Sequence, residues 1–211
     1  MANTHSAVHG GHHPVDPSVP AEYHSEENSL RIAGFWIFLG SDLVLFSCLF
    51  ATYVVMHGSV AGGPTSKQLF DVTGFTIETI ALLFSSFTCG LATYEMRRGN
   101  RNAMIAWMII TVLLGYVFLG FEIQEFVHNV SIGATMQRSG FLSAFFTLVG
   151  THGCHVTLGT FWMISIIIQL AKYGITPITA RKAFIVSIYW HFLDAVWIFI
   201  FTVVYLTGKV I

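Results

Sequence analysis

Residues 139–170 read SGFLSAFFTLVGTHGCHVTLGTFWMISIIIQL, a stretch that is apolar except near its middle. Roughly 20 apolar residues are enough for a helix to cross the hydrocarbon of a bilayer, and this stretch is longer. His152 and His155 are three residues apart, so they share one face of a helix. Imidazoles in hydrocarbon need polar surroundings. The pattern therefore predicts a transmembrane helix that packs against other helices.

The whole chain has the composition of an integral membrane protein. It has 211 residues, of which 54% are hydrophobic and 10% charged, whereas soluble domains average about 25% charged residues. No basic patch is visible, so nucleic-acid binding is not expected. Cys48, Cys89 and Cys154 lie in apolar runs without metal-binding spacing, and we expect them to be small buried hydrophobic residues. The polar first thirty residues lack the apolar core of a signal peptide.

Four further apolar runs predict four more spans. They cover about residues 31–56, 72–96, 103–128 and 183–206. In lipid such segments must be helices, because every backbone group needs an internal partner. We therefore expect an all-α bundle of five transmembrane helices over residues 31–211. Residues 1–30 are polar and rich in histidine, which predicts a mobile tail whose imidazoles either are simply solvated or bind a transition metal.

Basic residues are distributed unequally between the two ends of the predicted spans. Seven lie on the side of the N-terminal tail, whereas three lie on the opposite side. The seven are Arg31, Arg97, Arg98, Arg101, Lys172, Arg181 and Lys182, and the three are Lys67, Arg138 and Lys209. Positive residues favour the cytoplasmic side, so the N-terminus is expected in the cytoplasm and the C-terminus in the periplasm. Gly62-Gly63-Pro64 predicts a turn in an outer loop.

Seven ionisable residues lie within or near the predicted spans, and such residues are candidates for function. They are Asp42, Glu78, Glu125, His152, His155, His191 and Asp194. Three interpretations remain open: a metal site, a proton path for which Asp42 is the best candidate, and hydrogen bonds between helices. We favour the last, in which His152 and His155 bond to Glu125 or Asp194. These residues would then be interhelical contacts or line a lipid cleft.

Two functions of other classes use the same residues. A membrane metalloenzyme would build its site from Glu125, His128, His152, His155 and His191. However, helical two-metal sites use two Glu-x-x-His motifs, and this chain has one, at Glu125–His128. A small transporter would couple a substrate or protons to Asp42 and Glu78, although the interrupted helices typical of transporters are not visible.

Four sequence elements together resemble subunit III of the haem-copper oxidases. They occur in order from about residue 31 to the C-terminus, one in each of four predicted spans. The elements are Gly34-Phe35-Trp36 with Ser41-Asp42-Leu43, Glu122-x-x-Glu125-Phe126, His152-Gly153-Cys154-His155-Val156 with Gly159, and Trp190-His191-Phe192-Leu193-Asp194-x-x-Trp197. Five spans, and Asp42 where the cytochrome c oxidase branch has Glu, are most similar to the cytochrome o (bo3-type) ubiquinol oxidase branch. A cytochrome c oxidase subunit III is the alternative.

The resemblance implies a non-catalytic accessory subunit of a proton-pumping terminal oxidase in the bacterial inner membrane. It implies that this chain holds no cofactor, and that the haems and copper belong to subunit I. Subunits I, II and IV and phospholipids would be its partners. Its role would be assembly, lipid binding and sustained turnover, with Asp42 matching a buried carboxylate beside the lipid cleft. No copper-type cysteine spacing or haem-ligating histidine arrangement appears in the sequence.

Overall fold

The computed structural model describes residues 20–23, 26–60 and 72–210, and this part of the chain is helical without strands. Five helical segments are long and apolar enough to cross a membrane. The predicted all-α fold of five spans is confirmed. The elements are the short 3-10 helix η1 (Ala21–Tyr23), α1 (Glu26–Met56), α3 (Val72–Arg97), α4 (Arg101–Ser131), α5 (Gly140–Tyr173), α6 (Pro177–Ile200), a π-helical turn (Phe201–Leu206) and α7 (Thr207–Val210).

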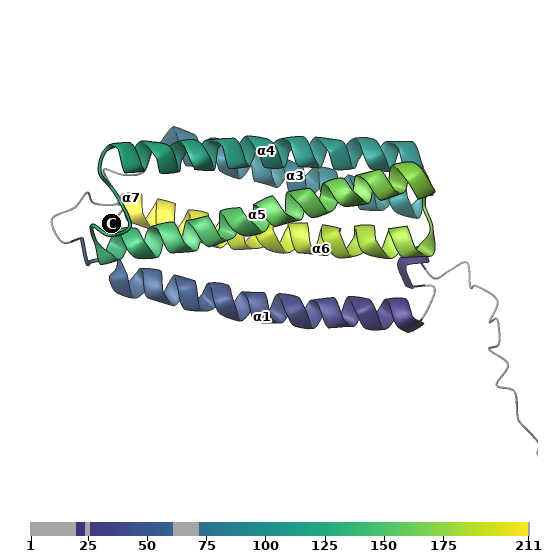
Figure 1. The fold of residues 1–211 in the computed structure, drawn as a ribbon, viewed down its shortest axis with the longest axis horizontal. Coiled ribbons are helices and arrows are strands. Elements are labelled where there is room, and N and C mark those ends of the chain that lie inside the picture. Colours follow the sequence, from purple (N-terminus) through teal and green to yellow (C-terminus); the bar gives the residue numbers. More distant parts are fainter. Residues whose placement is uncertain (1–19, 24–25, 61–71, 211) are drawn as a thin grey trace, which may run out of the picture.

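The five long helices run roughly along one axis (Figure 1). Helices α5 and α6 lie in the middle, with α1 packed along one side and α3 and α4 paired on the other. η1 and the C-terminal helix α7 lie at opposite ends of the bundle, as an odd number of spans requires. α1 packs against α5, α6 and η1, so one flank of α1 is left exposed.

Side-chain caps fix the helix ends between the spans. Ser139 accepts a hydrogen bond from the Leu142 amide and starts α5, as this residue type does at an N-cap. Gly174 follows α5 with φ +72°, a conformation that favours glycine. Thr176 and Thr179 then form a capping box around Pro177. This box starts α6 six residues before the predicted beginning at about 183.

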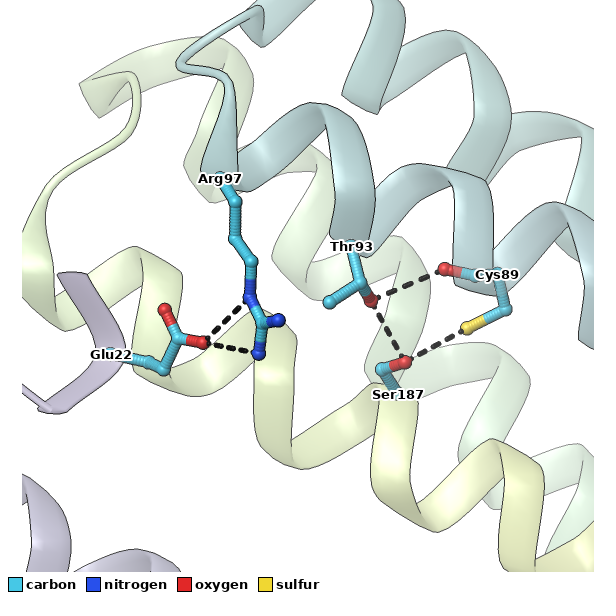
Figure 2. Close-up of polar contacts among 5 residues, drawn as sticks. All are labelled: Glu22, Cys89, Thr93, Arg97 and Ser187. Carbon is cyan, nitrogen blue, oxygen red and sulfur yellow. Dashed lines mark hydrogen bonds and ion pairs between the residues drawn. The ribbon is translucent and has the colours of Figure 1, made fainter. Parts of the chain in front are cut away.

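The first span begins earlier than expected. α1 begins at Glu26 rather than near residue 31, and Glu22 in η1 is fully buried. Arg97 at the end of α3 donates two hydrogen bonds to Glu22 Oε1, at 3.0 and 3.2 Å (Figure 2). This contact fixes η1 to the bundle. Residues 1–19 with most of the tail histidines, His24, and the predicted turn at 62–64 lie outside the described residues.

The cysteines differ from the expectation of burial. Cys89 is buried, and its thiol donates to Ser187 Oγ at 3.4 Å, with Thr93 donating to the same oxygen at 3.0 Å (Figure 2). Cys48 and Cys154 are exposed on the outer faces of α1 and α5. In a membrane protein an exposed apolar residue needs no protein neighbour, because lipid chains are themselves apolar.

The two tryptophans of the fifth span join α6 to α3 from the core. Trp190 and Trp197 are fully buried, and their indole nitrogens donate to Ser85 and Thr79, at 3.0 and 3.1 Å. A glycine makes room for the first ring, because a Cβ at Gly115 would lie 2.9 Å from Trp190 Cη2. Small residues that allow close approach are typical of membrane helix packing.

Replacing Arg97 by Gln should loosen the N-terminal segment, because the buried Glu22 carboxylate would lose its charged partner. A buried acceptor left without its partner costs about 1–3 kcal/mol. We expect faster proteolysis near η1, measured by limited digestion and mass spectrometry. Arg98→Gln is the matched control, since Arg98 pairs with Glu95 on the surface. Equal digestion rates for the two variants would contradict a fixing role for the Glu22 contact.

Candidate functional site

The seven predicted polar residues do not converge on one site. They separate into three groups on different helix pairs. We call Asp42 and His155 the central pair, Glu78, Glu122 and Glu125 the acid cluster, and Ser86, His191 and Asp194 the outer triad. Ser86 and Glu122 were not among the predicted residues, and His152 belongs to none of the three groups.

The central pair connects α1 to α5. Asp42 Oδ2 lies 3.8 Å from His155 Nε2, while His155 Nδ1 lies 2.7 Å from its own helix carbonyl at Thr151. Tyr189 on α6 donates to the His155 carbonyl at 3.3 Å. Both side chains are largely buried. His155 thus pairs with an acid on α1, not with Glu125 or Asp194 as expected.

His152 is surrounded by aromatic rings. It is fully buried, and neither ring nitrogen has a hydrogen-bond partner among the described residues. Its ring stacks on Trp197 at a centroid distance of 5.4 Å and meets Phe118 edge-on at 5.8 Å. The expected bonds from His152 to Glu125 or Asp194 are not formed. The imidazole therefore packs as a flat ring between α4, α5 and α6.

The acid cluster lies between α3 and α4. Glu78 and Glu122 are 1% and 4% exposed, and the three carboxyl groups lie near one another. Tyr205 donates to Glu125 Oε2 at 3.0 Å from the π-helical turn that ends the fifth span. Such turns are frequent at functional positions. The i, i+3 spacing of Glu122 and Glu125 was visible in the sequence, and it is the signal that could have added Glu122 to the predicted set.

A glycine on α5 receives the Glu122 carboxylate. A Cβ at Gly153 would lie 2.4 Å from Glu122 Oε1 and 2.5 Å from Oε2. Gly153 is itself buried between the two histidines of the fourth span. The glycine of the His-Gly-x-His element therefore lets a helix α4 side chain reach the α5 backbone.

The outer triad lies between α3 and α6. Ser86 Oγ and His191 Nδ1 are 2.8 Å apart, and Asp194 lies near Ser86. Asp194 is buried, whereas His191 is exposed. Ser86 was not in the predicted set because that set contained only ionisable residues.

The described residues do not assemble the predicted metal site. Across residues 20–23, 26–60 and 72–210, no three His, Cys, Asp or Glu side chains are grouped so as to hold a metal ion. Of the five proposed ligands, Glu125 bonds to Tyr205, His155 faces Asp42 and His191 meets Ser86. These contacts lie on different helix pairs, so the ligand set is divided.

A groove of about 550 Å³ opens between α1, α5 and α6 near the start of α6. One part of its lining is basic and another is aromatic. The residues that line it are Arg31, Gly34, Phe35, Phe38, Trp162, Ile166, Gln169, Arg181, Lys182 and Ile185. Phe35 and Trp162 meet edge-on at 5.8 Å. Asp42 and His155 lie seven residues from Phe35 and Trp162, so the central pair is about 10 Å further along the same helices.

Comparison with known proteins agrees with this architecture. The family model described as "Cytochrome c oxidase subunit III" matches residues 23–209. The chain therefore belongs to the cytochrome c oxidase subunit III family, and the resemblance to haem-copper oxidase subunit III is confirmed. With its five spans, it is a multi-pass membrane protein.

The relatives carry the name of the quinol branch. The chain is 58% identical over 191 residues to "Quinol oxidase subunit 3" of Bacillus spizizenii, covering 90% of this chain and 94% of the relative. The protein of that name from Bacillus subtilis is 57% identical and also covers 90% of this chain and 94% of the relative. "Probable quinol oxidase subunit 3" of Staphylococcus haemolyticus is 52% identical, covering 88% and 93%. The branch favoured by the sequence is supported, and these bacterial relatives place the chain among bacterial membrane proteins.

Replacing Gly153 by Ala should destabilise the bundle, because the new methyl group would collide with the buried Glu122 carboxylate. Overpacking of this kind costs about 1–3 kcal/mol. The free energy of unfolding can be measured by SDS titration in mixed micelles. Gly150→Ala on the same helix is the control, since its Cβ would lie an ordinary 3.5 Å from Phe126.

A second substitution identifies the colliding group. In a Glu122→Ala background, Gly153→Ala should become nearly neutral, so the two effects should not add. If Gly153→Ala is tolerated as well as Gly150→Ala, or is equally harmful with and without Glu122, the contact does not have the proposed role.

Proposed function

We propose that this chain is the non-catalytic subunit III of a terminal quinol oxidase. The complex would oxidise quinol, reduce oxygen to water and pump protons, with its haems and copper in subunit I. The observation that carries the proposal is the nearly full-length match to proteins named quinol oxidase subunit 3, at up to 58% identity. Subunits I, II and IV of the same oxidase are the expected neighbours.

The contacts of the buried polar residues support a structural role. Asp42 and His155 join α1 to α5, Ser86 and His191 join α3 to α6, and Glu125 is bonded from the last turn of the fifth span. Hydrogen bonds between membrane helices average roughly 0.6 kcal/mol each. We propose that these groups, with Glu78, His152 and Asp194, hold the bundle together and leave redox chemistry to neighbouring subunits.

The distribution of charge supports an N-terminus in the cytoplasm. The end of the bundle that carries η1 also contains the helix ends with Arg97, Arg101 and Lys172. Arg101 donates to the Ala171 carbonyl, so the start of α4 is connected to the last turn of α5. Because cytoplasmic loops of membrane proteins are enriched in Lys and Arg, we assign this end to the cytoplasm and the C-terminus to the periplasm.

The groove beside α1 supports lipid binding. Lys182 bonds to Gln169 at 2.7 Å and Arg181 bonds to Asn28, so cations are held at the proposed cytoplasmic end. Phe35, Phe38 and Trp162 continue the lining toward the membrane centre. A cation above an apolar wall matches an anionic phospholipid, whose headgroup lies at the interface and whose chains lie in hydrocarbon. Bound lipid would connect α1 to the bundle and help to sustain turnover.

Removing two cations from the groove should release bound lipid. We expect Arg31→Gln with Lys182→Gln to lower the anionic phospholipid that copurifies with the oxidase by at least twofold, measured by mass spectrometry of extracted lipids. Lys172→Gln is the control, because Lys172 is exposed and lies outside the groove. If the double variant retains as much anionic lipid as the control, the groove is not a headgroup site.

Copurification tests the proposed function directly. The tagged chain, extracted from its native membrane in mild detergent, should bring with it partners that carry haem, seen in the absorption spectrum of the reduced sample. After dissociation in harsh detergent, the separated chain should be free of haem. Stoichiometric iron or copper bound to the separated chain lacking residues 1–19 would instead support the metalloenzyme alternative.

A further inference from the structure

The exposed imidazole of His191 lies at the middle of the membrane. It is the fifteenth of thirty residues in the span Pro177–Leu206, and Ser86 is the thirteenth of twenty-four in the span Gly74–Arg97. The other His, Asp and Glu side chains in the middle of the described spans are buried or half-buried. Ionisable groups at this depth almost always face protein or water rather than lipid.

Two exposed hydroxyl groups in the spans are satisfied within their own helix. Ser47 on α1 donates to the Leu43 carbonyl at 2.7 Å, and Thr147 on α5 donates to the Ser143 carbonyl at 2.7 Å. An imidazole differs from a hydroxyl group because it has two separate ring nitrogens, each of which can form a hydrogen bond. In His191 only Nδ1 is engaged, by Ser86, and Nε2 forms no hydrogen bond within the described part of the chain.

A small residue lies one helical turn from His191 and another lies one turn from Ser86. Ala195 is one helical turn beyond His191 on α6 and is exposed, and Gly90 is one turn beyond Ser86 on α3. A Cβ at Gly90 would meet no atom within 4 Å. Small residues beside a polar group allow another helix to approach closely and to form a hydrogen bond. Lipid chains offer neither a donor nor an acceptor at this depth.

We propose that the α3–α6 face around His191 is the surface that receives a transmembrane helix of a neighbouring oxidase subunit. The helix presents a polar side chain or a free carbonyl to His191 Nε2 at the centre of the bilayer. Ser86, 2.8 Å from Nδ1, holds the imidazole in the orientation that this contact needs. The inference rests on the proposed function, since it assigns one face of this chain to an assembly of oxidase subunits.

Site-specific crosslinking tests the location. A photoreactive benzophenone amino acid is placed at Leu83 or Ile198, which are exposed beside Ser86 and His191, or at the control positions Val44 on α1 and Phe161 on α5. Irradiation of the intact oxidase in native membranes should give adducts with another oxidase subunit from Leu83 and Ile198, at least fivefold more than from the control positions. Adducts with lipid alone, or with a second copy of this chain, would overturn the proposal.

The result also separates this inference from the proposed function. Adducts with oxidase subunits from Val44 or Phe161, but not from Leu83 or Ile198, would move the interface to another face and leave the function intact. The absence of oxidase subunits from every adduct and from the purified complex would reject the function itself.

Substitution of His191 tests the contact. His191→Leu should reduce the amount of this chain retained in the purified oxidase at least threefold, while His191→Gln, which keeps a hydrogen-bonding group, should retain more than the Leu variant. His128→Leu, an exposed histidine near a helix end, is the control. If His191→Leu folds and is retained as well as the control, the Nε2 contact is not part of the interface.

Discussion

The structure depends on one constraint: polar side chains placed in hydrocarbon must meet protein groups, because lipid offers them no hydrogen bonds. Asp42 approaches His155 across α1 and α5 at 3.8 Å, and Ser86 meets His191 across α3 and α6 at 2.8 Å. The central and outer contacts connect different helix pairs, α1 with α5 and α3 with α6. The helices are thus positioned by polar contacts as well as by the aromatic core, in which Trp190 and Trp197 reach α3 through their indole nitrogens.

The same constraint explains why the described residues do not form a metal centre. A metal centre needs several ligands turned toward one point, whereas the three histidines in the fourth and fifth spans are turned in different directions. His152 lies in an aromatic enclosure, His155 faces α1 and His191 faces outward. Such a distribution suits a protein whose task is to pack against neighbours. The groove beside α1 and the face around His191 lie on different helix pairs, so lipid and a partner subunit could be bound at the same time.

Much of the fold was predictable because the bilayer allows few solutions. Five apolar runs of sufficient length specify five helices, and the predicted spans agree with the observed ones apart from their ends. The ends differed where a local motif acted, as in the Thr176–Thr179 capping box that starts α6 early. The burial of Glu22 could not be predicted, for another reason. The burial of Glu22 depends on Arg97, a residue far along the chain.

The sequence by itself determined which residues are polar within the membrane, the number of spans and the family, since composition, periodicity and ordered motifs are properties of the chain alone. Only the tertiary structure decided which polar residues meet. Asp42 rather than Glu125 faces His155, and Glu122 rests on Gly153. Spacing along one helix shows which side chains share a face, but the partner of that face depends on the rotation and crossing of neighbouring helices. Those are set by the packing of all five helices together.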